Sequence, residues 1–400
     1  MKKDHPVSDE YSPGVFNLFL LFSFMGIHKL PDFVINRLKA WEIVQRPASL
    51  LKELVENSLD AWANKIEITI NDWGKTFLSV QDDGSWIELS DMDLLLERYA
   101  TSKIATEKDL YSLESYGFRW EALASIAEVS KISVLTKTKY AEIGTKLVRR
   151  GNENVVRHMG VPFEHGTLIT VEDLFYNVPA RLKFLRSAQT EFYYCYNYFV
   201  DVALFHYDKA FVLKKNDKIV FDLKDSRELQ PRILELYKKD WGDKLIPFTQ
   251  KEEGISMRGI LSDSSLRFGS AENIKIYVNG RPVQDRIIKR ALLDVYSRQI
   301  APGEYPMAIL MLEVNPENVD VNVHPTKKEV RYKNTNQYLF EFLADVDENN
   351  MSLVKKIAET FGNSLRGYEL ADAKTLLPVY SQEDSRFRKL ILDAIDKDVF

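Results

Sequence analysis

The chain has one cysteine, few glycines and no long apolar run. Cys195 is the only cysteine among 400 residues, which excludes a disulfide framework and a cysteine-built metal cluster and suits a reducing cytoplasm. We expect this thiol to be buried, because it stands in an aromatic run over residues 192–199. The most apolar stretch, residues 15–24, is interrupted by Asn17 and Ser23 and is shorter than the about 20 residues that a bilayer span requires.

A charge excess of one sign is also missing. The net charge of −5 gives no global signature of nucleic-acid binding, so any DNA contact must come from a local patch. A hydrophobic content of 45% is ample for two or three packed domains. Two segments supply candidate DNA contacts, and a solvated basic face is the alternative for each. The first contains Arg181, Lys183 and Arg186, and the second contains Arg281, Arg286, Lys289 and Arg290.

A helix predicted over Ser49 to Ala61 carries an acid and an amide on one face. Pro47 sits where helix starts tolerate proline, and apolar residues follow at helical spacing. Glu53 and Asn57 are four residues apart, so they lie one turn from each other on the same side. A carboxylate that can take a proton from water, beside an amide oxygen that can ligate a hard cation, is half of a nucleotide-hydrolysis site. Taken alone, the pair also fits an ordinary solvated helix.

Further motifs follow in a fixed order along the chain. Asp82-Asp83-Gly84-Ser85 ends an alternating strand, and Ala100 to Lys103, Gly117-Phe118-Arg119 and Gly166-Thr167 come later. This order resembles the ATP-binding fold shared by type II topoisomerases, histidine kinases and MutL mismatch-repair proteins. Three strings match the MutL branch, namely Asp173 to Arg181, Tyr277 to Arg281 and Val321 to Lys327. The resemblance runs from about Met25 to about Phe342.

The resemblance implies an α+β protein: a GHKL (Bergerat-type) ATPase α/β sandwich followed by a ribosomal-protein-S5-domain-2-like domain. We expect the ATPase domain over residues 25–223, the second, transducer and DNA-binding domain over 225–342, and a linker or helical tail over 343–400. Residues 1–24 match nothing in the family, and a short strand follows Met25, so we expect an N-terminal extension that is non-native or disordered, with Met25 as the true start.

The hydrophobic pattern predicts the main elements independently of the resemblance. In the first domain these are helices over 32–43 and 49–61, a hairpin over 65–81, a helix near 123–126, and strands over 131–136 and 167–171. In the second they are helices over 230–238 and 286–297 and strands over 255–261, 274–278 and 307–314.

The resemblance also implies roles for individual residues. Glu53 would be the general base, and Asn57 the protein ligand of a Mg²⁺ ion that bridges the phosphates of ATP. Asp82 would accept the adenine amino hydrogen, with a turn aspartate as the alternative, and Asp83 replaces a common asparagine. Lys327 would reach the γ-phosphate from the second domain, unless it lies in a solvated loop. The remaining expected nucleotide contacts are Gly84, Thr101, Ser102, Lys103, Gly117, Phe118, Arg119 and Thr167.

The function implied is that of a weak Mg²⁺-dependent ATPase in DNA mismatch repair. ATP-driven homodimerisation would couple mismatch recognition to strand processing in the cytoplasm, at the nucleoid. The implied partners are DNA, a MutS-type mismatch recognition protein and a downstream helicase or nickase, with no membrane. A catalytically inactive MutL-like clamp or scaffold is the alternative. A topoisomerase or chaperone subunit fits the Tyr277 to Arg281 string less well. No endonuclease-type acid and histidine cluster is visible, so we expect no endonuclease activity in this chain.

The six tryptophans are the one systematic departure from the family. Trp41, Trp62, Trp86 and Trp120 occupy positions where the family motifs carry glycine, and Trp73 and Trp241 stand in turns. Glycine is scarce, at 17 of 400 residues against about 7% usually. Decay of an unused gene would scatter substitutions and would hardly spare Glu53 and Asn57. The pattern therefore favours UGA codons that mean glycine in the source organism, over an inactive paralogue.

Overall fold

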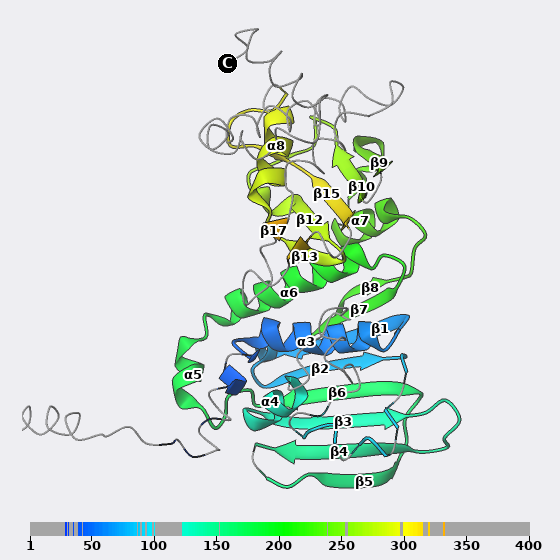
Figure 1. Ribbon diagram of the computed structural model, residues 1–400, viewed down its shortest axis with the longest axis vertical. Helices are drawn as coiled ribbons and strands as arrows, with labels where there is room; N and C mark the ends of the chain where they lie inside the picture. Colours follow the sequence, from blue (N-terminus) through cyan, green and yellow to red (C-terminus); the bar gives the residue numbers. More distant parts are fainter. Residues whose placement is uncertain are drawn as a thin grey trace, which may run out of the picture.

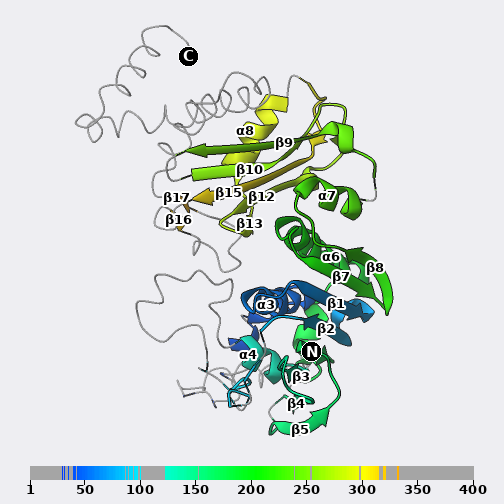
Figure 2. The same cartoon turned by 90° about the vertical axis from the view of Figure 1, so that its right-hand side faces the viewer.

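The computed structural model describes residues 29, 31, 35, 39–41, 43–85, 87–88, 90–92, 94–97, 100, 122–151, 153–237, 239–252, 255–296, 299–314, 319–320 and 331–332. Within them lie two main β-sheets with helices beside and between them (Figures 1 and 2). In this part of the chain no helix is long and apolar enough to cross a membrane. The predicted extension over 1–24, the start at Met25 and the tail over 343–400 lie outside the described residues.

The first sheet has eight strands in the order β5-β4-β3-β6-β2-β1-β7-β8. All neighbouring pairs are antiparallel except β1 and β7, which are parallel. Its strands are β1 (Lys65–Asn71), β2 (Phe77–Asp82), β3 (Lys131–Lys137), β4 (Gly144–Arg150), β5 (Val156–Val161), β6 (Gly166–Glu172), β7 (Ala210–Lys215) and β8 (Lys218–Leu223).

Helices cover one face of this sheet because its strands alternate between apolar and polar side chains. On β1, Ile66, Ile68 and Ile70 are fully buried while their neighbours are partly exposed. In Figure 1, α3 (Pro47–Asp60) and α4 (Ala122–Glu128) lie in front of the sheet. The chain then forms α5 (Pro179–Phe184) and α6 (Ala188–Phe205), and α6 packs on α3.

The second sheet has five strands in the order β13-β12-β15-β10-β9. Strands β12 and β15 run parallel as neighbours, and the chain between them forms α8. The elements of this part are α7 (Leu229–Tyr237), β9 (Leu245–Glu252), β10 (Ile255–Ser262), β12 (Ile274–Val278), β13 (Arg281–Val283), α8 (Arg286–Tyr296) and β15 (Ala308–Val314), with short pairs β11 (Arg267–Phe268) and β14 (Tyr305–Pro306), and β16 (Val319–Asp320) and β17 (Arg331–Tyr332).

The α+β class is confirmed, as are the predicted motif helix, the first hairpin and the main elements of the second sheet. Of the helix expected over 32–43, residues 35, 39–41 and 43 are described, and they are helical. The 18-residue helix α6 was not predicted. It buries Cys195, as expected, and burial raises the pKa of this thiol to about 12.

Candidate functional site

Asp82, at the end of β2, is a buried carboxylate held by several hydrogen bonds. Its Oδ2 accepts a bond of 2.7 Å from the Ser58 hydroxyl, and its Oδ1 accepts one of 3.0 Å from the Gly84 N–H. Burial raises the pKa of Asp82 above its ordinary value, although these bonds and one from the Thr167 backbone act in the opposite direction. A carboxylate oriented in this way can accept a hydrogen from a ligand, and its bond from the Gly84 N–H two residues on also fits a turn aspartate.

Two glycines allow the backbone to crowd around Asp82. A Cβ on Gly84 would lie 2.6 Å from the carbonyl oxygen of Ala61, where α3 ends. A Cβ on Gly166, whose φ is +105°, would lie 2.0 Å from the carbonyl oxygen of Asp82. Both distances are too short for any side chain, so these glycines are required for α3, β2 and β6 to meet here.

The acid and the amide lie on α3, the helix that reaches Asp82 through Ser58. Glu53 is buried at 8% exposure, and Asn57 is half-buried one turn later. Ser58 directly follows Asn57, and its hydroxyl bond ties α3 to Asp82 at the end of β2. Sequence reasoning missed Ser58, since nothing near it in the chain shows that its partner lies 24 residues away.

A second polar link extends from Thr167. Its side chain is buried, and its Oγ1 lies 3.2 Å from Oγ1 of Thr136 on the neighbouring strand β3. The Thr136 hydroxyl also accepts a bond of 3.3 Å from the N–H of Ile87. Thr136 was not predicted from the sequence, because strand threonines are common and only the β3–β6 pairing places it opposite Thr167.

The substitution at Asp83 has a simple local explanation. Its Oδ1 accepts bonds of 2.8 Å from the backbone N–H groups of Asn64 and Lys65, at the start of β1. An asparagine oxygen would accept the same two bonds, so either residue can hold this turn. Other expected nucleotide contacts, namely Thr101, Ser102, Lys103, Gly117, Phe118, Arg119 and Lys327, lie outside the described residues.

Comparison with protein families gives two matches along the chain. Residues 45–160 match the histidine kinase-, DNA gyrase B- and HSP90-like ATPase model, and residues 233–349 match the model of the DNA mismatch repair protein C-terminal domain. DNA mismatch repair protein MutL of Syntrophobacter fumaroxidans is 42% identical over 305 residues, which cover 76% of this chain and 45% of the relative. MutL of Parabacteroides distasonis is 39% identical over 310 residues, which cover 77% and 50%. The chain belongs to the MutL family.

Solved structures agree with this assignment. The Aquifex aeolicus MutL ATPase domain complexed with ADP is 26% identical, with a TM-score of 0.53 over 68% of this chain and 94% of that one. The fold is also that of the N-terminal domain of a DNA repair protein, with a TM-score of 0.65 at 23% identity over 84% and 99% of the two chains. The chain spans about half the length of the curated MutL relatives. The inactive clamp has no support in these comparisons.

Two of the tryptophans have the backbone conformation of glycine. Trp62 follows the end of α3 with φ at 58°, and its side chain is 83% exposed. Its N–H bonds to the carbonyl of Leu59, and the next N–H, of Ala63, bonds to that of Ser58. This pair of bonds defines a Schellman motif, in which Trp62 occupies the left-handed position that glycine usually fills. Trp73, with φ at 53°, follows Asp72, with φ at 42°, in the β1–β2 turn, as in a hairpin turn that favours Asp-Gly.

The other described tryptophans, Trp41 and Trp241, differ in how well the protein accommodates them. The ring nitrogen of Trp41 is buried without a hydrogen-bond partner, an arrangement that folded proteins usually avoid. Trp241 has a φ of −115°, which any residue adopts, and its ring packs between Tyr237 and Phe268 at centroid distances of 5.5 and 5.6 Å. Trp86 and Trp120 lie outside the described residues. Backbone geometry therefore supports glycine most directly at positions 62 and 73.

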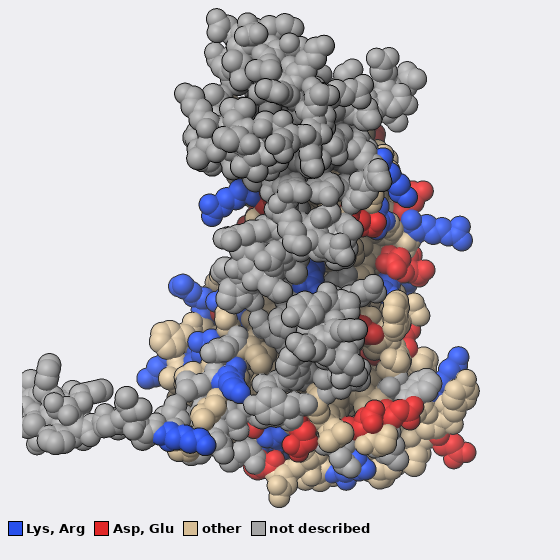
Figure 3. All heavy atoms as spheres, viewed as in Figure 1, with Lys and Arg blue, Asp and Glu red and all other residues tan. Residues whose placement is uncertain are grey.

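The second basic cluster forms one face of α8. Arg286, Lys289 and Arg290 are exposed or half-exposed at helical spacing, whereas Ile288 and Leu292 are buried against the second sheet. Arg281 lies just before this helix, on β13. On the face shown in Figure 3, the described Lys and Arg side chains stand in several separate places, in keeping with the small net charge of −5.

In the first cluster Lys183 and Arg186 are exposed, whereas Arg181 is half-buried. The Arg181 guanidinium donates a bond of 3.3 Å to the carbonyl oxygen of Trp41, and its Nε is buried. Arg181 therefore faces the protein instead of presenting a free charge to DNA.

Proposed function

We propose that this chain is the N-terminal ATPase region and second domain of a DNA mismatch repair MutL protein, with domains over residues 25–223 and 225–342. The observation that carries the nucleotide site is the buried Asp82 carboxylate, oriented by Ser58 on the same helix as Glu53 and Asn57. The similarity to an ATPase domain solved with ADP supports a nucleotide as the ligand.

Within this proposal, Asp82 accepts the adenine amino hydrogen and Thr167 supports the same end of the pocket. Glu53 takes the proton of the attacking water, and its burial keeps this carboxylate out of bulk solvent. The Asn57 amide oxygen fits Mg²⁺, which prefers oxygen ligands and takes few of them from protein. Bound magnesium would neutralise phosphate charge. Lys327 would contact the γ-phosphate.

The proposal extends to partners and place of action. ATP-bound chains dimerise, the cluster of Arg281, Arg286, Lys289 and Arg290 contacts DNA backbone, and a MutS-type protein and a downstream helicase or nickase bind the dimer. The setting is the cytoplasm, at the nucleoid. This stretch of chain carries no endonuclease activity.

The test uses the chain with glycine at the six tryptophan positions. It should hydrolyse ATP slowly in the presence of magnesium, and Glu53→Ala should abolish turnover while nucleotide binding, followed by calorimetry, remains. Glu56→Ala is the matched control, because Glu56 lies on the same helix but pairs with Lys52 at 3.6 Å. Unchanged turnover in Glu53→Ala would remove the role of general base from Glu53.

A further inference from the structure

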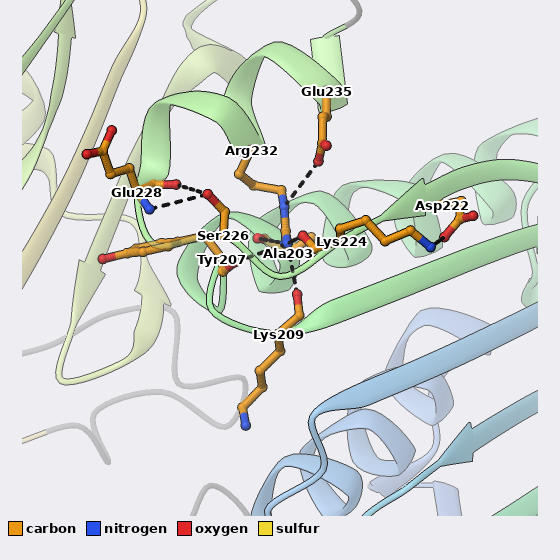
Figure 4. Close-up of polar contacts among 9 residues, drawn as sticks. All are labelled: Ala203, Tyr207, Lys209, Asp222, Lys224, Ser226, Glu228, Arg232 and Glu235. Carbon is orange, nitrogen blue, oxygen red and sulfur yellow. Dashed lines mark hydrogen bonds and ion pairs between the residues drawn. The ribbon is translucent and has the colours of Figure 1, made fainter.

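Arg232, on α7, is fully buried and binds backbone from several segments. Its guanidinium donates to the carbonyl oxygens of Ala203 at 2.7 Å, Tyr207 at 3.1 Å, Lys209 at 2.8 Å and Lys224 at 2.5 Å (Figure 4). Its Nε lies 3.8 Å from the Glu235 carboxylate one turn along the helix. A fully buried arginine is rare, and here the carbonyl groups replace its hydration.

The four carbonyls belong to distinct parts of the first sheet and its helices. Ala203 lies in the last turns of α6, Tyr207 and Lys209 in the turn that enters β7, and Lys224 just after β8. Nη1 of the guanidinium bonds Ala203, and the two hydrogens of Nη2 are shared among the carbonyls of Tyr207, Lys209 and Lys224. Arg232 therefore joins the end of α6 and both ends of the β7–β8 hairpin to α7, the first helix of the second part of the chain.

The second sheet is attached to the same place. The Tyr277 hydroxyl on β12 donates a bond of 2.8 Å to the carbonyl of Asp201 in α6, and the Lys275 ammonium lies 2.7 Å from the Asp201 carboxylate. Arg258 on β10 donates a bond of 2.6 Å to the hydroxyl of Tyr207. One hydrophobic cluster runs through this joint, from α3 and α6 to buried residues of α7, β10, β12 and β15.

We propose that Arg232 is a positioning residue that fixes the orientation of the second sheet relative to the first, and that ATP turnover depends on this orientation. The dependence of ATP turnover on this orientation rests on the proposed function, in which a lysine of the second part completes the nucleotide site. Arg232 contacts backbone carbonyls and Glu235 in the structure, so its effect on turnover is indirect.

The experiment measures orientation and turnover separately, in the full chain with glycine at the six tryptophan positions. Spin labels at Glu142→Cys and Ser270→Cys, both exposed, report the distance between the two parts by pulsed electron resonance. Cys195 is buried and its raised pKa of about 12 keeps it unreactive toward the label. Arg232→Lys retains the charge but loses the fork. Arg267→Met is the control, since Arg267 is half-exposed and pairs only with Glu304 among the contacts described.

We expect Arg232→Lys to broaden the distance distribution and to lower kcat about tenfold, with the KM for ATP changed less than about twofold. Arg267→Met should leave the distance distribution, kcat and the KM for ATP unchanged. A milder variant, Tyr277→Phe, removes one hydroxyl contact of the same joint and should broaden the distribution to a smaller extent, which tests the idea even where Arg232→Lys fails to fold.

Three results would overturn the inference. The first is a distance distribution that stays narrow in both Arg232→Lys and Tyr277→Phe. The second is an unchanged kcat although the distance distribution broadens, and the third is a rise in KM equal to the fall in kcat. If the parent chain shows no ATP turnover at all, the proposed function fails. The distance measurement then still decides whether Arg232 fixes the orientation of the two sheets.

Discussion

Replacing Trp62 by glycine should stabilise the protein. Trp62 has a left-handed backbone at φ 58°, which costs about 1–2 kcal/mol for any residue with a Cβ. Glycine removes this cost but adds flexibility to the unfolded chain, worth about 0.5–1 kcal/mol in the opposite direction. The indole is 83% exposed, so its removal sacrifices little burial.

The balance favours Trp62→Gly by roughly 1 kcal/mol, which corresponds to a rise in melting temperature of about 2–4 °C for a domain of this size. The comparison is best made by calorimetry in a chain whose other five tryptophans are already glycine. Trp62→Ala is the matched control, because alanine also lacks the indole but keeps the Cβ and with it the backbone penalty. It should melt close to the tryptophan form.

Equal melting temperatures for glycine and alanine at position 62 would refute this reasoning, since the size of the side chain, and not the backbone, would then be the problem. A tryptophan form that melts highest would refute it more strongly. In that case Trp62 would be the residue for which the turn is adapted.

Three further predictions concern the gene, the nucleotide site and pH. All six tryptophan codons should be UGA and the native peptides should contain glycine; a UGG codon at Trp86 or Trp120, or a native peptide mass with tryptophan there, would contradict this. Lys327→Ala should weaken ATP turnover and ATP-driven dimerisation without lowering the melting temperature, and rates equal to the parent would show that Lys327 does not reach the nucleotide. Asp82→Asn should abolish ATP binding yet stabilise the fold at neutral pH, because burial raises the pKa of Asp82 and the charged form is unfavourable there. Because the pKa is raised in the folded state, the stability that this carboxyl contributes is lost as pH rises through its folded-state pKa. The gain in unfolding free energy of Asp82→Asn over the parent, measured by urea unfolding, should therefore shrink as pH falls toward 3.8. A gain that does not change with pH would contradict this prediction.

The sequence predicts those elements whose pattern is local. The alternation in β1 and the apolar spacing in α3 and α8 locate these elements within a few residues. Helix α6 was missed because aromatic residues occur on all its sides between Phe192 and Phe199, so no apolar face is visible. The segments that form β4, β5, β7 and β8 show no clear alternation of apolar and polar residues, so these strands were not predicted.

The same limit applies to the site. Glu53 and Asn57 are recognisable because four-residue spacing on a helix is local information. Ser58 and Thr136 act through partners 24 and 31 residues away, and Arg232 binds carbonyls that α6 and two strand ends supply. Such roles follow from strand register and helix packing, which no short motif encodes.

The single parallel pairing of the first sheet has a consequence for how the protein is made. β1 pairs with β7 from Lys65 with Ala210 onward, so one side of β1 stays unpaired until more than a hundred further residues have left the ribosome. Its hairpin partner β2 forms locally, but the open edge of β1 exposes backbone groups that can pair with other chains. Chains that stop before β7 should therefore aggregate, while chains that extend past Leu223 contain every strand needed to complete the sheet.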